Sequence, residues 1–183
     1  MIRLTRPGGG VILWSPRAAD REETLRLYRA SRRLHRGLVA PPVTARQFAA
    51  YMARRRRPES PGFVICRRSD GAMVGGINFN EIVRGVFKSA YVGYQIGAPF
   101  ARQGYMTEAL DLALRFAFGG LKLHRVEANI QPGNRPSLAL VRRAGFRREG
   151  FSPRYLKIGG RWRDHERWAL LAEDWAVARR RAR

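Results

Sequence analysis

The sequence predicts a single domain of the α+β class, a mixed α/β fold. Three observations support this prediction. The length of 183 residues suits one domain. The hydrophobic fraction of 45% is enough for a globular core. Antiparallel hairpins are combined with two strand–loop–helix units. No repeat or linker divides the chain, so we expect one domain over residues 1–183, with a disordered basic tail over 176–183.

The first half of the chain is predicted to hold four strands and two helices. Helical spacing of apolar residues predicts a first helix between Asp20 and Leu34, and a second that Thr44 caps and Pro58 ends. Ser69–Gly71 reads as a tight turn between two strands. The four strands are expected over Val11–Trp14, Phe63–Arg67, Met73–Ile82 and Ala90–Ile96.

The second half begins with a long helix that starts at Tyr105 and ends at Gly119–Gly120. A fifth strand is expected over Arg125–Ile130. Asn134 is a good N-cap for a short helix over Arg135–Arg143. The last two strands are expected over Tyr155–Ile158 and Trp162–Leu171, joined as a hairpin by Gly159–Gly160.

The chain is strongly basic. It has 36 Lys and Arg against 14 Asp and Glu, which gives a formal charge of +22. Residues 21–57 alone carry eleven arginines and two glutamates. Such a charge attracts polyanions, so contact with ribosomal RNA or the ribosome is one expectation. Alternatively, the excess of arginine reflects only the composition of the sequence. The Arg54–Arg57 run also fits the solvent-exposed end of a helix. The charge disfavours a polycationic acceptor.

Several classes of protein are not favoured. Cys66 is the single cysteine, so no internal disulfide and no cysteine-rich metal site is expected. The histidine spacings give no metal site, and we expect no metal. The first residues lack the apolar segment of a secretory signal, and no apolar stretch of about 18 residues occurs. We therefore expect a cytoplasmic protein without membrane contact.

A phosphate site is indicated where the segment Gly97–Gly104 enters the long helix. The start of a helix presents unpaired backbone N–H groups, backed by the helix dipole, and these bind phosphate. Arg102 adds a cation, and Gly104 permits a positive φ. A loop that only turns the chain is the alternative interpretation.

The segments around this loop resemble the GCN5-related N-acetyltransferases (GNAT). Within that family, the stretch Ile82–Phe87 and the ending Tyr155–His165 resemble the RimJ/RimL branch, and RimJ most of all. Members of this branch acetylate the N-termini of ribosomal proteins. The resemblance covers nearly the whole chain, although residues 1–60 match only in outline. The motifs that carry it are Tyr91–Ile96, Ala101–Ala109, Leu123–Asn129, Asn134–Ser137 and Gly145–Phe146.

The resemblance implies the GNAT fold: a central, mostly antiparallel sheet of about seven strands, splayed between strands four and five and flanked by about four helices. It implies acetyl-CoA as co-substrate, with the pantetheine arm paired to the edge of the fourth strand. Asn134 would line this arm, or act only as a helix N-cap, or do both. The implied cofactor-binding residues are Tyr94, Gln95, Ile96, Arg102, Gln103, Gly104, Tyr105, Met106, Thr107, Asn129, Asn134 and Ser137.

The phosphate loop departs from the family pattern at two positions. The pattern Gln/Arg-x-x-Gly-x-Gly/Ala falls on Pro99–Gly104. Pro99 replaces Gln/Arg, and Arg102 replaces the first glycine. Gly104 is kept. Because backbone amides bind the phosphates in this mode, the departures leave the assignment in place, and Arg102 could lie against a phosphate.

The resemblance implies Ser137 as the acid that protonates the departing CoA thiolate, whereas a local hydrogen bond at the helix end is the alternative role. The family's base glutamate is absent, because Arg154 stands near its position. Glu81 is our candidate base, and Asp164, His165 and Glu166 are alternatives. A water relay would also suffice, since an α-amine has a pKa near ~8. His35 is expected beside the substrate loop.

The expected function is therefore acetyl-CoA-dependent transfer of an acetyl group directly to an α-amine, such as the N-terminus of a ribosomal or other protein. Cys66 lies on an early strand away from the motifs, so no acyl-enzyme is expected. Two alternatives remain open. One is a small-molecule amine acetyltransferase, and the other is a module that binds polyanions or CoA without catalysis. A monomer and a homodimer fit the sequence equally.

Overall fold

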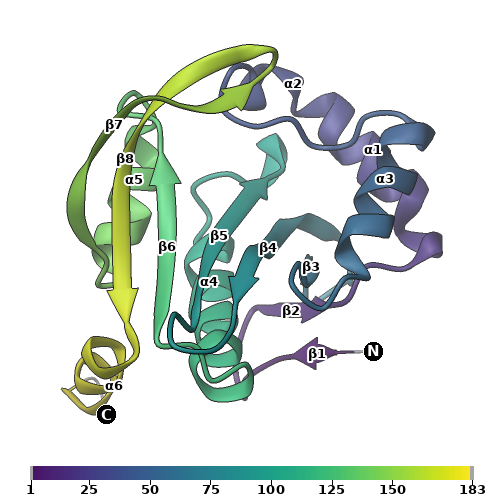
Figure 1. The fold of residues 1–183 in the computed structure, drawn as a ribbon. Helices are drawn as coiled ribbons and strands as arrows, with labels where there is room; N and C mark the ends of the chain where they lie inside the picture. The colour runs from purple at the N-terminus through teal and green to yellow at the C-terminus, as the bar shows by residue number, and fades with distance from the viewer. Residues whose placement is uncertain (1, 182–183) are drawn as a thin grey trace.

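The computed structural model describes residues 2–181 (Figure 1). Its sheet has eight strands in the order β1-β2-β3-β4-β5-β6-β8-β7. All neighbours pair antiparallel except β5 and β6, which pair parallel. The strands are β1 (Arg3–Leu4), β2 (Val11–Trp14), β3 (Gly62–Arg67), β4 (Met73–Val83), β5 (Ser89–Ile96), β6 (Arg125–Ile130), β7 (Arg147–Ile158) and β8 (Arg161–Leu171).

Helices cover both faces of this sheet. Figure 1 shows α1, α2 and α3 grouped at one end of the molecule, with α4 and α5 behind the strands. None of the helices within residues 2–181 is long and apolar enough to cross a membrane. The helices are α1 (Arg21–Ala30), α2 (Arg32–His35), α3 (Ala45–Arg55), α4 (Tyr105–Arg115), α5 (Arg135–Arg143) and α6 (Ala172–Arg181).

Successive side chains of a strand point to opposite faces of the sheet, so alternate residues pack against different helices. On β3, Phe63 and Ile65 join the main core with α4 and α5, where Leu110 is fully buried. The intervening Val64 and Cys66 point the other way and pack under α1. The sheet therefore lies between α4 and α5 on one face and α1 on the other.

The sheet opens between β5 and β6, as the family resemblance implied. The two strands pair only over Ser89–Tyr91 with Arg125–Glu127, although β5 continues to Ile96. All of β6 stays paired with β8, over Arg125–Ile130. The second half of β5 therefore has a ladder partner only on its β4 side. This splay between the predicted fourth and fifth strands is confirmed.

Three elements differ from the sequence prediction. β1 has two residues, too few for a recognisable pattern, and it makes the eighth strand. β7 begins at Arg147 rather than Tyr155. The sequence does not indicate its first half, because these residues are mostly exposed and show no clear apolar alternation. The basic tail that we expect to be disordered over 176–183 lies within α6 as far as residue 181. Just before it, Trp175 packs on Phe118 with ring centroids 5.2 Å apart. Residues 182–183 lie outside the described part.

Candidate active site

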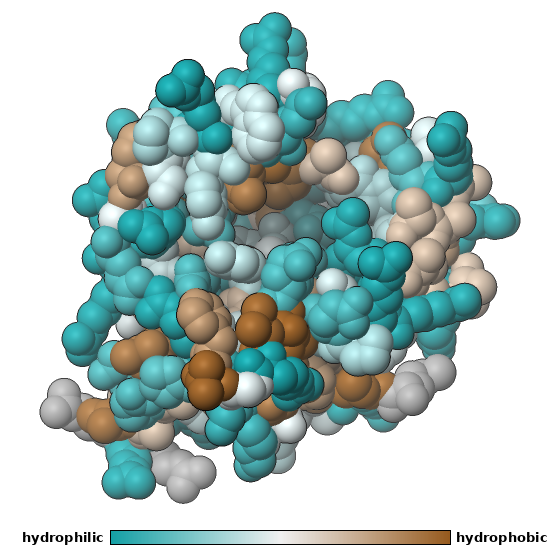
Figure 2. Space-filling view, in the orientation of Figure 1, coloured by the Kyte–Doolittle hydropathy of each residue, from teal (hydrophilic) through white to brown (hydrophobic). Residues whose placement is uncertain are grey.

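A cavity of about 720 Å³ lies at the splay between β5 and β6. Tyr94 and Gln95, which are adjacent on β5, both line it. Neighbouring strand residues point to opposite faces: Tyr94 packs against the main core, while the Gln95 Nε2 group donates to the Tyr28 hydroxyl of α1 at 3.0 Å. The cavity therefore passes through the sheet. Figure 2 shows the surface hollowed near the centre of the view, between the β7–β8 hairpin and the α1–α3 group.

One wall is the open edge of β5. The Gly97 N–H donates across to the Val74 carbonyl at 2.7 Å. Backbone groups alternate sides along an antiparallel ladder, so those of Tyr94 and Ile96 face the opening instead. The Ile96 carbonyl accepts a hydrogen bond there from His35 Nε2 at 2.8 Å. An extended ligand could pair with the remaining groups as an added strand.

A second wall is the N-terminus of α4. Gly104 is its N-cap with φ 84°, and Arg102 also has a positive φ of 63°. The amides of Thr107 and Glu108 bond to the Gly104 carbonyl. Within residues 2–181, the amides of Tyr105 and Met106 have no acceptor, so they remain available to an anion.

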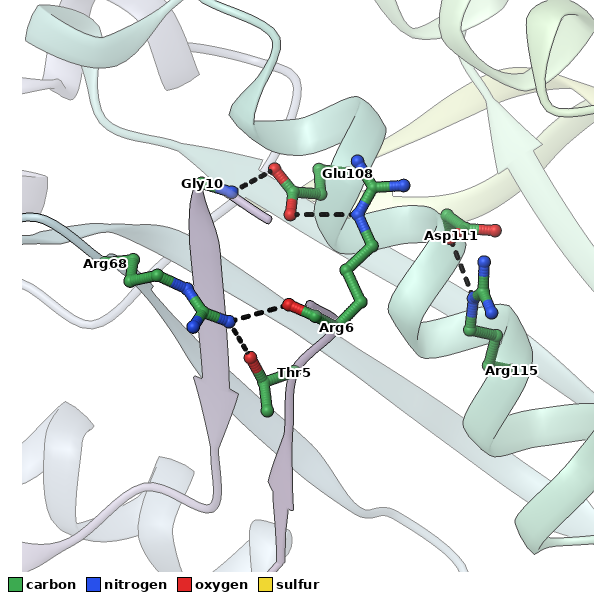
Figure 3. Close-up of polar contacts among 7 residues, drawn as sticks. All are labelled: Thr5, Arg6, Gly10, Arg68, Glu108, Asp111 and Arg115. Carbon is green, nitrogen blue, oxygen red and sulfur yellow. Dashed lines mark hydrogen bonds and ion pairs between the residues drawn. The ribbon is translucent and has the colours of Figure 1, made fainter. Parts of the chain in front are cut away.

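The charge of the cavity is positive. Arg102 from the loop and Arg143 from α5 both line it, and no Asp or Glu is among its described lining residues. The nearby carboxylate of Glu108 is not among the lining residues and points toward Arg6 and Gly10 (Figure 3). It accepts from the Gly10 N–H at 2.9 Å and from Arg6 Nε at 3.3 Å. That ion pair fastens α4 to the N-terminal hairpin and leaves the free amides facing the cavity.

The third wall, α5, presents Ser137 to Tyr94. Asn134 caps this helix through its side chain, which accepts from the Ser137 N–H at 3.3 Å. The Ser137 hydroxyl is thus not part of the cap. Burial raises the pKa of Tyr94 to about 12, and the neighbouring Ser137 hydroxyl opposes this rise. No hydrogen bond of regular geometry satisfies the Tyr94 hydroxyl within the described chain.

The predicted cofactor-binding residues gather at this cavity, with one exception. Asn129 lies on β6 outside the lining, and its buried Oδ1 has no partner within the described residues. The others line the cavity: Tyr94, Gln95, Ile96, Arg102, Gln103, Gly104, Tyr105, Met106, Thr107, Asn134 and Ser137.

The candidate bases do not line the cavity. Glu81 is exposed near the end of β4, at a left-handed φ of 51° within an irregular stretch of the ladder. Asp164 accepts from the Arg154 N–H at 2.7 Å, and Glu166 accepts from Arg148 and from Trp168 at 3.0 Å. His165 is buried and bonds to the Arg163 carbonyl. The last three therefore serve contacts within the β7–β8 hairpin.

Two further placements bear on the chemistry. Cys66 is buried beneath α1, where burial raises its thiol pKa to about 12, and it does not line the cavity. Sequence reasoning did not identify Arg143 as a lining residue. Its spacing of seven from Pro136, nearly two helical turns, and of three from Leu140 could have indicated the shared face. No cluster of metal-ligating side chains occurs among residues 2–181.

Known proteins share this fold and these motifs. Residues 11–147 match the family model of the acetyltransferase (GNAT) domain. The Bacillus subtilis probable N-acetyltransferase YjcK is 36% identical over 129 residues, covering 70% of this chain and 71% of its own. The Escherichia coli ribosomal protein uS5-alanine N-acetyltransferase is 42% identical over 107 residues, covering 58% of this chain and 55% of its own.

A solved structure agrees over nearly the full length. Mycobacterium smegmatis RimJ, in complex with CoA-disulfide, superposes with a TM-score of 0.82 at 28% identity, covering 97% of this chain and 93% of that one. The Vibrio fischeri ribosomal-protein-S5-alanine acetyltransferase has the same fold, with a TM-score of 0.83 at 20% identity. The chain therefore belongs to the GNAT family of N-acetyltransferases and is of the RimJ/RimL type.

Proposed function

We propose that this N-acetyltransferase transfers the acetyl group of acetyl-CoA to the α-amine of a protein N-terminus, with a ribosomal protein as the acceptor class. The carrying observation is the cavity that passes through the sheet, with a positive, carboxylate-free lining and the free amides of α4 in one wall. The name of the Escherichia coli relative supports the acceptor class, and the CoA-disulfide in the Mycobacterium smegmatis structure supports the co-substrate.

The lining fits acetyl-CoA in two places. The amides of Tyr105 and Met106, with Arg102 and Arg143, suit the phosphates, because unpaired amides and guanidinium groups both bind phosphate oxygens. The open edge of β5 suits the pantetheine arm, whose amides can pair as a strand would. Within the described residues, neither the Tyr105 and Met106 amides nor the second half of the open β5 edge is paired with another strand or helix.

The residues at the splay suit direct transfer. The amine nitrogen forms a bond to the acetyl carbon, and the C–S bond then breaks with its electron pair moving to sulfur. An open backbone N–H of β5 can stabilise the oxyanion of the tetrahedral intermediate. Ser137 is the proposed acid for the sulfur, with the Tyr94 hydroxyl beside it. Cys66, protonated and distant from the lining, takes no part.

The amine loses its proton without an adjacent carboxylate in this proposal. An α-amine with a pKa near ~8 is partly neutral at pH 7, and water in the cavity can take the second proton. Glu81 remains a candidate base only through such a water relay, because its side chain is exposed and lies outside the cavity lining.

The acceptor would approach from the face opposite to α4, where the surface is hollowed (Figure 2). A protein N-terminus is favoured over a polycationic small molecule because the net charge of +22 repels polycations. A neutral small amine is the second candidate acceptor, and it would fit the same opening.

The test is acetyl-CoA consumption with a matched panel of acceptors. It comprises peptides with free N-terminal alanine or serine, the same peptides with blocked N-termini and one lysine, spermidine, and an uncharged alkylamine. We expect turnover with free N-termini and none with blocked ones. Turnover with small amines alone would replace the acceptor class. Acetyl-CoA binding without turnover on any acceptor would favour a non-catalytic module.

A further inference from the structure

The turn between β1 and β2, residues 5–10, lies against the start of α4 and is here called the N-terminal turn. Its Gly10 N–H and its Arg6 Nε donate to the two oxygens of the Glu108 carboxylate, at 2.9 and 3.3 Å (Figure 3). The Glu108 side chain is only 14% exposed. A carboxylate that is largely buried is costly unless it is paired, and the N-terminal turn supplies both partners.

This close fit depends on the absence of a side chain at Gly9. A Cβ atom there would lie 2.2 Å from Glu108 Oε1 and 2.8 Å from the Cγ of Arg6, closer than non-bonded atoms approach. The φ of Gly9 is not in the left-handed region. The position therefore requires glycine for space and not for backbone freedom, and any side chain at Gly9 would displace Glu108 or Arg6.

The N-terminal turn is itself held by Arg68, in the turn after β3. The Arg68 N–H donates to the Gly10 carbonyl at 2.8 Å. Its guanidinium group donates to the Thr5 hydroxyl and, at 2.8 Å, to the Arg6 carbonyl (Figure 3). The Arg6 carbonyl also accepts from the Gly9 N–H at 3.2 Å. The carboxylate of Glu108 is thus bound to a segment that is fixed to the sheet.

Glu108 ties this segment to the first turn of α4. The body of the helix is held by the core, where Leu110 is fully buried, but Tyr105 and Met106 are only partly buried. The Glu108 N–H donates to the Gly104 carbonyl at 3.2 Å and so closes the first helical turn. The free amides of Tyr105 and Met106 lie between these two residues. Fixing Glu108 therefore fixes the part of the helix that faces the cavity.

The charge of Glu108 would act against a phosphate bound at these amides, because like charges repel. Pairing with Arg6 reduces this repulsion but does not explain why a carboxylate lies so near. If the charge were its main effect on the ligand, removal of Glu108 would strengthen acetyl-CoA binding. If Glu108 instead holds the helix start in place, its removal would weaken binding. The two roles predict opposite signs.

We propose that Glu108 is a positioning residue that, held by the N-terminal turn, fixes the first turn of α4 so that its free amides meet the diphosphate of acetyl-CoA. The inference rests on the proposed function, because it needs acetyl-CoA in this cavity. It also gives a role to the glycines of the N-terminal turn, which lies outside the residues 11–147 that match the family model.

The test measures equilibrium binding of acetyl-CoA and of S-acetylpantetheine, which keeps the arm and the thioester but has no diphosphate. Glu108→Ala and Gly9→Ala should each bind acetyl-CoA about tenfold more weakly, because a phosphate site that is no longer pre-organised must be ordered on binding. S-acetylpantetheine should bind as it does to the wild type. Gly9→Ala retains every charge, so it decides the question if Glu108→Ala does not fold.

Glu108→Gln separates the tether from the charge. Its amide oxygen can still accept from the Gly10 N–H, so it should bind acetyl-CoA more tightly than Glu108→Ala does. A loss of folding stability alone would not produce this order, because binding is measured on the folded protein. Nor would it distinguish acetyl-CoA from S-acetylpantetheine.

Two matched controls should bind both ligands as the wild type does. Asp111→Ala removes another carboxylate of α4, one that pairs with Arg115 of the same helix at 2.8 Å (Figure 3). Gly119→Ala adds a methyl group where a Cβ meets nothing within 4 Å, outside the cavity lining.

Three results would overturn the proposal. They are unchanged or tighter binding of acetyl-CoA by Gly9→Ala or a folded Glu108→Ala, an equal loss for the two ligands, and the same loss in the control variants. A wild-type protein that binds no acetyl-CoA at all would instead refute the proposed function, so the two failures are distinguishable.

Discussion

The buried hydroxyl of Tyr94 on β5 lies beside the hydroxyl of Ser137 in the first turn of α5, across the opening of the sheet. Neither hydroxyl has a hydrogen bond of regular geometry within the described chain. Two uncharged donors thus face the place where the arm of acetyl-CoA would end. A donor that acts as the C–S bond breaks lowers the barrier without tightening ground-state binding.

We predict that Ser137→Ala lowers kcat by about tenfold to a hundredfold, toward the low end for general acid help, because CoA is already a tolerable leaving group. Acetyl-CoA affinity should stay nearly unchanged. The thermal midpoint should also stay unchanged, since the helix cap uses the Ser137 backbone N–H and not its hydroxyl. Steady-state kinetics, equilibrium binding and thermal melting on one variant measure all three.

Asn134→Ala is the structural control for this prediction. It removes the side chain that caps α5 and should cost about 1 kcal/mol of folding stability. If Ser137→Ala also lowers the melting temperature and keeps full kcat, Ser137 leaves the mechanism. Tyr94→Phe then tests whether the neighbouring hydroxyl supplies the proton instead.

Local sequence was enough to predict α4 and α5, whereas the splay followed from the family resemblance. Gly104 and Asn134 mark helix starts, and the motifs from Tyr91 to Phe146 place the open strand. The sequence analysis did not predict α6, which makes a distant contact through Trp175 and Phe118. Propensity alone does not show such packing.

The site was predictable only where backbone motifs define it. The loop and the edge of β5 follow from the motifs, whereas the choice among Glu81, Asp164, His165 and Glu166 depended on side-chain directions set by β7 and β8. The hairpin uses Asp164 and Glu166 for its own contacts with Arg154, Arg148 and Trp168. Spacing in the sequence carries no information on such pairings.

We predict that stability falls as the pH is lowered from 7 toward 5. Burial is the main cause of the lowered pKa values of His35 and His165 in the folded protein. The unfolded chain, with an ordinary histidine pKa near ~6.5, then binds more protons than the folded one, so stability decreases with falling pH. The decline begins near the unfolded pKa and ends below the folded values.

Urea unfolding at a series of pH values measures this slope. His35→Phe and His165→Phe should each flatten it. The ion-paired carboxylates with lowered pKa values, Asp70, Glu149 and Glu173, act only below their ordinary range of about 4 to 4.5 and leave this window unaffected. A flat profile between pH 7 and 5 would show that neither histidine is linked to folding.

The exposed arginines of α2 and the turn after it predict a salt-dependent association with RNA. Arg32, Arg33 and Arg36 are exposed and flank Leu34 and His35, which line the cavity. We expect binding to ribosomal RNA at about 50 mM salt that weakens steeply at higher salt. Replacing these three arginines by glutamine should reduce the slope of log K against log salt by about two to three, at ~0.7–0.9 per phosphate contact.

The matched control removes the same charge elsewhere. Arg84, Lys88 and Lys122 are also exposed, and neither they nor their immediate neighbours line the cavity. Their triple glutamine variant should keep the wild-type slope. An equal loss in both triple variants would mean that net charge alone attracts the RNA, and no binding at 50 mM salt would make the arginine excess compositional.

Arg102 gives the sharpest test of the phosphate loop, because its backbone and its side chain predict opposite effects of one substitution. It adopts φ 63° at a position where the family pattern has glycine. A left-handed conformation costs a non-glycine residue ~1–2 kcal/mol, while glycine's extra freedom in the unfolded chain costs roughly 0.5–1 kcal/mol. Arg102→Gly should therefore fold as stably as the wild type or up to about 1.5 kcal/mol more stably.

The same variant should bind acetyl-CoA about tenfold more weakly, because it loses a charge-assisted contact to phosphate. S-acetylpantetheine, which has no diphosphate, should bind both proteins equally, and Arg102→Lys should fall between them because lysine keeps the charge but not the planar fork. Calorimetry with both ligands and thermal melting measure these effects. If Arg102→Gly binds acetyl-CoA as tightly as the wild type, the backbone amides of α4 hold the phosphates unaided, and the strain at Arg102 has another origin.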